Sequence, residues 1–130
     1  MTRIMVVDDE PDIVYLVSKM LEREGYDVFS ADSGEEAVEK LKTERPDLIL
    51  MDVMMPGMNG WETSKKIKAN PELSKIPIAM LTVKSSQNDM EKSFDYGGVN
   101  AHIPKPIINK KMLNTIKWLL KNVPKTGDVQ

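Results

Sequence analysis

The chain has 130 residues, the usual size of one compact domain, and 41% hydrophobic with 29% charged residues is typical of a globular fold. Its 18 basic and 20 acidic residues leave a formal charge of −2, which argues against a polybasic nucleic-acid binder. Cysteine is absent and His102 is the one histidine, which excludes disulfide scaffolds, cysteine-based zinc sites and any mechanism that needs two imidazoles.

Five short apolar runs recur along the chain, with room for one helix between each pair. Continuous runs of Ile, Leu and Val are typical of strands that are buried on both faces of a parallel sheet. The runs lie at Ile4–Val7, Val28–Phe29, Leu48–Met51, Ile78–Leu81 and Ala101–Ile103. The pattern predicts an α/β domain, a (βα)5 fold with a five-stranded, doubly wound parallel sheet.

Helical periodicity fills the segments between the early runs. Ile13–Glu24 keeps its apolar residues on one side, and Gly25 then ends the helix. Ser33–Glu36 reads as a capping box at the start of a second helix. Asn59 can cap a third helix through Lys68, whose lysines at 65, 66 and 68 are predicted to form a solvated face.

Two further helices are predicted in the last third of the chain. Ser86–Asp89 is another capping-box candidate, and Gly97–Gly98 marks the end of that helix. Leu113–Leu120 carries the spacing of a last amphipathic helix. Residues 123–130 are predicted to be a frayed polar tail, so we expect the domain to span residues 1–122.

The sequence shows neither a secretory signal nor a membrane span. The first apolar run follows Met1–Arg3 directly and is too short for a signal core. No run approaches the ~20 apolar residues that a spanning helix requires. We therefore expect a cytoplasmic protein with no membrane or nucleic-acid partner.

Chemically reactive side chains follow four of the five apolar runs. Asp8–Glu10 comes after the first run, Asp52 after the third, Thr82 after the fourth and Lys105 just after the fifth. In open parallel sheets, ligands bind beyond the carboxyl ends of the strands. We expect these side chains to converge at that edge of the sheet.

A cluster of three carboxylates must either keep a proton or bind a cation, because each charge raises the pKa of the others. An all-oxygen set selects a hard ion such as Mg²⁺, Mn²⁺ or Ca²⁺. Lys105 and Thr82 suit contacts to phosphate oxygens. Together these groups are the parts needed to move a phosphoryl group onto or off an aspartate.

Four sequence pieces stand in a recognisable order and spacing. They are Val6–Pro11, Asp47–Gly60, Pro77–Thr82 and Lys105–Pro106. With them the chain resembles a response-regulator receiver domain of the chemotaxis-regulator type over about residues 3–120. The resemblance implies the flavodoxin-like strand order 2-1-3-4-5 and a cis bond between Lys105 and Pro106.

The resemblance also implies roles for single residues. Asp52 stands where the family carries the phospho-accepting aspartate, and Lys105 and Thr82 stand where its lysine and switch hydroxyl contact the phosphoryl group. The implied Mg²⁺ ligands are the carboxylates of Asp8, Asp9 and Asp52 and the backbone carbonyl of Met54. Mn²⁺ or Ca²⁺ can substitute in such a site.

Two residues depart from the family pattern. His102 stands where the family usually has a Tyr or Phe switch ring, so either His102 does a similar job or coupling runs through Thr82 and the backbone. Val83 stands where Ala or Gly is common, and its branched side chain is expected to crowd the phosphoryl site and slow transfer or hydrolysis.

The implied function is a phosphorylation-controlled switch. A histidine kinase or phosphotransfer protein would donate the phosphoryl group from its phosphohistidine, and the face made by helix four, strand five and helix five would repack. Because the tail is too short to fold alone, we expect a stand-alone domain that binds an effector on a separate chain, as a monomer or weak dimer. Its only chemistry would be self-phosphotransfer and autodephosphorylation, so it is not expected to be an enzyme.

Two other functions fit part of the pattern. A small metal-dependent phosphohydrolase would also use an aspartyl phosphate, but such enzymes usually carry an Asp-x-Asp pattern that Asp8–Asp9 lacks, and need room for a cap domain. A pseudo-receiver, a binding module that is never phosphorylated, is favoured modestly by Val83 and His102.

Overall fold

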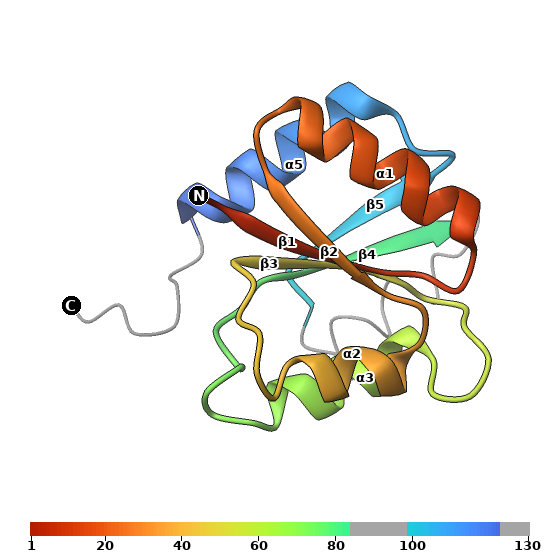
Figure 1. Cartoon of the computed structure of the whole chain (residues 1–130), viewed down its shortest axis with the longest axis vertical. Coiled ribbons are helices and arrows are strands. Elements are labelled where there is room, and N and C mark those ends of the chain that lie inside the picture. The colour runs from red at the N-terminus through yellow and green to blue at the C-terminus, as the bar shows by residue number, and fades with distance from the viewer. Residues whose placement is uncertain (84–98, 123–130) are drawn as a thin grey trace.

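A computed structural model of the chain describes residues 1–83 and 99–122 and shows five strands in one sheet (Figure 1). The strands are β1 (Arg3–Val7), β2 (Asp27–Ala31), β3 (Leu48–Asp52), β4 (Ile78–Val83) and β5 (Ala101–Lys105). They pair in parallel in the order β2-β1-β3-β4-β5. The predicted fold class and strand order are confirmed.

Helices cover both faces of this sheet in the described part of the chain. They are α1 (Pro11–Arg23), α2 (Gly34–Lys40), α3 (Gly60–Lys68) and α5 (Asn109–Asn122). Figure 1 shows α1 and α5 on one face and α2 and α3 on the other, as in a doubly wound fold. The helix predicted from Ser86 to Gly98 and the predicted tail at 123–130 lie outside the described residues.

The strand residues alternate between two apolar cores. In β1, Ile4 and Val6 belong to the core under α1 and α5, whereas Met5 and Val7 belong to the core under α2 and α3. All four side chains are fully buried. Successive side chains of a strand point to opposite faces, so a continuous apolar run is required where both faces are covered.

The first two helices begin and end where the sequence indicates. Pro11 occupies the first turn of α1, and Gly25 follows its end with a positive φ of 91°. The Ser33 hydroxyl caps α2 by accepting from the Glu36 N–H. The Glu36 carboxylate accepts from the N–H of Asp32, at 2.6 Å, and not from that of Ser33, so the predicted capping box is displaced by one residue.

Helix α3 begins with a complete capping box. The Asn59 side chain accepts from the Glu62 N–H at 2.9 Å, and the Glu62 carboxylate accepts from the Asn59 N–H at 3.0 Å. This reciprocal pair satisfies two backbone donors at the helix start, where four have no partner within the helix. The predicted start of this helix is confirmed.

The end of α3 departs from the prediction of a solvated lysine face. Lys65 and Lys66 are exposed, but Lys68 is partly buried, and its Nζ donates to the carbonyls of Ser74, at 3.0 Å, and Ile76, at 2.6 Å. Burial lowers the pKa of the Lys68 ammonium to about 8. The prediction is wrong for Lys68 because the segment that leads into β4 returns across the last turn of the helix.

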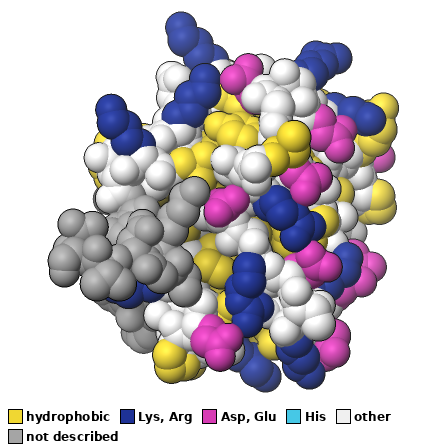
Figure 2. All heavy atoms as spheres, turned by 60° about the vertical axis from the view of Figure 1, so that its left-hand side comes forward, with side chains coloured by type: hydrophobic (Ala, Val, Ile, Leu, Met, Phe, Trp, Pro, Cys, Tyr) yellow, Lys and Arg dark blue, Asp and Glu magenta, His cyan; other side chains and the backbone are white. Residues whose placement is uncertain are grey.

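The surface carries both signs of charge side by side. On the face in Figure 2, the basic and acidic side chains that are described lie interspersed among apolar ones. Such mixing is unlike the continuous basic field that binds a nucleic-acid backbone. Among residues 1–83 and 99–122, none of the helices has the length and apolar character needed to cross a membrane.

Candidate functional site

The carboxyl ends of four strands meet at one edge of the sheet and bring the predicted site residues together. Asp8 follows β1 directly, Asp52 ends β3, and Lys105 ends β5. In the sheet register Asp52 lies opposite Leu81, which places Thr82 one step farther along β4. The convergence follows from parallel strands that start and stop at similar heights.

Lys105 is the centre of the polar contacts in this cluster. Its Nζ lies 2.9 Å from Asp52 Oδ1, 3.5 Å from Asp8 Oδ2 and 3.9 Å from Glu10 Oε1. Burial alone lowers the pKa of the ammonium, but the hydrogen bonds and charges of Asp52 and Asp8 outweigh it and raise that pKa. Lys105 is therefore held in its charged form. Its peptide bond to Pro106 is cis, as the resemblance implied.

The two acids nearest to Lys105 are buried. Asp8 is 1% exposed and Asp52 is 4% exposed. Burial raises the pKa of both carboxyls above the ordinary value, although Lys105 and a backbone N–H donated to each carboxylate act in the opposite direction. The single positive charge of Lys105 does not balance the negative charges of the acids in this cluster.

A divalent cation fits this arrangement. Oxygen atoms of Asp8, Asp9 and Asp52 all lie within 4.8 Å of one another. The set is made of carboxylates alone, which suits hard ions such as Mg²⁺. A positive ion would also offset the negative charge that burial makes costly here.

A small pocket of about 210 Å³ opens beside these acids. Asp52, Thr82, Met54 and Lys105, for which the sequence predicts roles, line it. Its other lining residues are Glu10, Val53 and Leu81. Glu10 belongs to the acids that the sequence predicts at this edge, whereas Val53 and Leu81 were not predicted as pocket residues. Each of these two adjoins a predicted residue at a strand end, and that position is the signal that could have found it.

The segment after Asp52 is tied back to the strand end. The N–H of Met54 donates to the Asp52 carboxylate, and the Met54 side chain is 70% exposed. The Gly60 N–H donates to the Val53 carbonyl at 2.9 Å. A Cβ at Gly60 would lie 2.4 Å from the Asp52 carbonyl oxygen, so only glycine lets α3 start this close to the site.

His102 and Val83 are the residues that depart from the family pattern. His102 is partly buried in β5, and burial lowers the pKa of its imidazole. It is not among the described residues that line the small pocket. The side chain of Val83 lies outside the described part of the structure, and its predicted effect stays a prediction.

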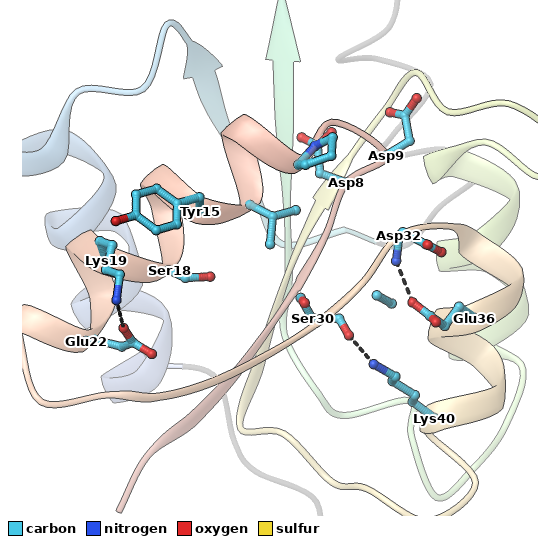
Figure 3. Close-up of a pocket in the computed structure, with 13 residues that line it drawn as sticks. Asp8, Asp9, Tyr15, Ser18, Lys19, Glu22, Ser30, Asp32, Glu36 and Lys40 are labelled. Atoms are coloured by element: carbon cyan, nitrogen blue, oxygen red, sulfur yellow. Dashed lines mark hydrogen bonds and ion pairs between the residues drawn. The ribbon is translucent and has the colours of Figure 1, made fainter.

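A larger groove of about 510 Å³ lies beside the acids, between α1 and α2 (Figure 3). Tyr15 lines it from α1, and Glu36 and Lys40 line it from α2. The Lys40 ammonium donates to the Ser30 carbonyl of β2, and Glu36 accepts from the N–H of Asp32, which follows the strand. Side chains of α2 thus bond the free edge of the sheet, where exposed backbone groups invite pairing with another strand.

Comparison with known proteins agrees with the geometry. The sequence model of the family described as "Response regulator receiver domain" matches residues 4–117. Protein PilH of Pseudomonas aeruginosa is 34% identical over 120 residues, which cover 92% of this chain and 98% of PilH.

Solved structures show the same fold. Chemotaxis protein CheY4 of Vibrio cholerae superposes with a TM-score of 0.85 at 32% identity, covering 90% of this chain and 97% of CheY4. The receiver domain of a sensor histidine kinase from Pseudomonas aeruginosa PAO1 gives a TM-score of 0.85 at 27% identity, covering 93% of this chain and 98% of that domain. In that structure a magnesium ion is coordinated in the active-site cleft.

Proposed function

Because the chain belongs to the response-regulator receiver domain family of two-component signalling, we propose that it is a switch controlled by phosphorylation of Asp52. The observation that carries the proposal is the contact of Asp52 with Lys105 at 2.9 Å, in a pocket that Thr82 also lines and beside the carboxylates of Asp8 and Asp9. These are the groups that a phosphoryl acceptor needs in one place.

The proposed metal ligands are the carboxylates of Asp8, Asp9 and Asp52 and the backbone carbonyl of Met54. A bound Mg²⁺ supplies positive charge for the phosphoryl oxygens, with Mn²⁺ or Ca²⁺ as substitutes. Support comes from the all-oxygen donor set and from the related receiver domain that was solved with magnesium.

The phosphoryl donor is a phosphohistidine of a histidine kinase or phosphotransfer protein. A carboxylate oxygen of Asp52 attacks the phosphorus, a P–O bond forms, and the P–N bond breaks. The electron pair of that bond goes to the histidine nitrogen of the donor. Lys105, already 2.9 Å from Asp52, remains beside the new phosphoryl oxygens and offsets their charge. Hydrolysis by water later returns the Asp52 carboxylate and inorganic phosphate.

The output of the switch begins at Thr82. Thr82 is 4% exposed in β4 and lines the pocket, and its hydroxyl would donate to a phosphoryl oxygen. That bond favours one packing of the face formed by β5, α5 and the helix that the sequence predicts between Ser86 and Gly98, with His102 of β5 as a candidate switch group. An effector on a separate chain, in the cytoplasm, would bind the favoured state.

Intact-mass measurement tests the acceptor directly. Wild type incubated with acetyl phosphate and Mg²⁺ should gain the mass of one phosphoryl group, which hydroxylamine then removes. Asp52→Asn should gain none, and omission of Mg²⁺ should reduce the gain in wild type. A wild type that binds Mg²⁺ and is never phosphorylated would instead support the pseudo-receiver, and an equal gain in Asp52→Asn would refute Asp52 as the acceptor.

A further inference from the structure

The loop between β3 and α3, residues 53–59, carries part of the proposed metal site. It begins beside Asp52, whose carboxylate accepts from the Met54 N–H. It ends at Gly60, whose N–H donates to the Val53 carbonyl at 2.9 Å. These two hydrogen bonds join the ends of the loop to the end of β3 and the start of α3, and they do not reach its middle.

The middle of the loop is held from a different helix. The Glu35 carboxylate in the first turn of α2 accepts from the Met58 N–H at 3.2 Å. Gly57, beside it, has a φ of 74°, and a Cβ there would lie 3.0 Å from Glu35 Oε2. The carboxylate thus lies directly against a left-handed turn that only glycine adopts without strain.

The start of α2 is itself fitted tightly against this region. A Cβ at Gly34 would lie 2.1 Å from Thr63 Oγ1 of α3 and 3.0 Å from the Met58 carbonyl oxygen. There is therefore little room for α2 to shift relative to the loop, and the backbone of Glu35 is held in place.

The same end of α2 is connected to the other acids of the site. The Asp8 N–H donates to the carbonyl of Ala31 at 3.2 Å, and Ala31 ends β2 just before the cap of α2. A continuous path runs from Asp8 through α2 to Met58. Glu35 makes the last contact of that path, across 23 residues of sequence.

We propose that Glu35 is a positioning residue, which fixes the β3–α3 loop so that the Met54 backbone stays in place relative to Asp52 and Asp8. This inference rests on the proposed function, because the Met54 carbonyl matters only if the acids bind a cation. The carboxylate of Glu35 acts through its hydrogen bond to the Met58 N–H, so an amide oxygen in the same place would serve as well.

Metal affinity is the first test. Calorimetric titration with Mg²⁺ should give about fivefold weaker binding for Glu35→Ala, the size expected for losing one hydrogen bond. Glu35→Gln should stay close to wild type. Glu39→Ala is the matched control, because Glu39 lies on the same helix, is exposed and pairs only locally with Lys42 in the described contacts. It should bind Mg²⁺ as wild type does.

Amide hydrogen exchange without metal is the second test and does not depend on the proposed function. Exchange at Met58 should be several times faster in Glu35→Ala than in wild type, Glu35→Gln and Glu39→Ala. Equal Met58 exchange in all four proteins would overturn the role of Glu35, and so would unchanged metal affinity in Glu35→Ala. Weakening in Glu35→Gln as large as in Glu35→Ala would show that charge, and not position, is the cause. A wild type that binds no Mg²⁺ would overturn both proposals.

Discussion

At each end of the sheet one basic residue contacts three acids, but only at the carboxyl end are two of those acids buried. At the amino end, Arg3 donates through Nε to Asp27 at 3.0 Å, through Nη1 to Glu44 at 2.7 Å, and through its backbone N–H to Asp47 at 2.8 Å. Its hydrogen bonds to Glu44 and Asp27 raise the pKa of the guanidinium. Each acid there has its own donor.

At the carboxyl end, three acids share one ammonium. Lys105 contacts Asp52, Asp8 and Glu10 through the same Nζ. The side chains of Asp8 and Asp52 are 0% and 6% exposed, whereas those of Arg3, Asp27 and Glu44 are between 34% and 50% exposed.

Residue types alone therefore do not make a binding site. The amino end is a solvated, paired cluster of the kind that adds modestly to stability. At the carboxyl end, burial raises the pKa of Asp8 and Asp52, and the charge of a neighbouring aspartate adds a smaller contribution in the same direction. Buried negative charge in excess disfavours the folded state without a cation. Excess negative charge of this kind is what a cation-binding site with a phosphoryl acceptor requires.

Replacing the basic residue at each end of the sheet should give the largest difference between the two ends. Lys105→Met leaves two buried carboxylates without their ammonium and should lower the free energy of unfolding by about 3 kcal/mol without Mg²⁺. Arg3→Met should cost about 1 kcal/mol, because its partners are solvated. Urea unfolding at pH 7 measures both, and added Mg²⁺ should restore part of the loss in Lys105→Met alone. Equal losses in the two variants would contradict the difference.

A substitution that displaces the backbone of Asp52 should have the next largest effect. Gly60→Ala places a Cβ 2.4 Å from the Asp52 carbonyl oxygen and 2.9 Å from the Cα of Val53, both of which are backbone atoms. We expect a loss of about 2 kcal/mol in unfolding free energy from overpacking, together with slower phosphorylation by acetyl phosphate. Gly25→Ala is the control for strain alone, because nothing lies within 4 Å of a Cβ there. It should leave the phosphorylation rate unchanged.

Neutralising one acid should stabilise the fold at the carboxyl end of the sheet and not at the amino end. Asp52→Asn should raise the free energy of unfolding without Mg²⁺ by about 1 kcal/mol at pH 7, because it removes buried like charge. Asp27→Asn should not stabilise. Since the folded pKa of Asp52 is raised, the folded state takes up the proton first as pH falls. Wild type therefore approaches Asp52→Asn in stability on acidification, and a gap that widens instead would be evidence against the raised pKa.

Lys68 offers the most specific contrast with Lys105, because only its effect depends on alkaline pH. Burial lowers its pKa from 10.5 to about 8, and it donates to backbone carbonyls. Between pH 8 and 10.5 the unfolded chain holds this proton more tightly than the folded one, so stability from this group rises with pH. Relative to Lys68→Met, wild type should gain about 2 kcal/mol over that window, which is less than the full shift implies because the group is partly exposed. A constant difference in urea unfolding would refute the lowered pKa.

The strand-end acids could be predicted because they depend on backbone geometry alone. A buried parallel strand requires a continuous apolar run, and the residue after the run must lie at the carboxyl edge. Asp8, Asp52 and Lys105 follow from that rule, and the structure places both acids within ion-pair distance of Lys105.

Contacts that depend on side-chain conformation and loop path could not be predicted. Lys68 has the sequence surroundings of Lys65 and Lys66, but a later segment covers it. Glu35 looks like an acid that suits the start of a helix, and its bond to Met58 requires the full path of the β3–α3 loop. The excess of charge around Asp52 likewise appears only when burial is known.

Titration of Mg²⁺ into wild type, Asp9→Asn and Asp27→Asn tests most directly whether the carboxyl end is the binding site. Wild type and Asp27→Asn should each bind one ion per chain with the same affinity. Asp9→Asn should bind more than about tenfold more weakly, since it loses a proposed ligand. Equal affinity in Asp9→Asn and wild type, or weakening by Asp27→Asn to the same extent, would contradict the assignment of the site.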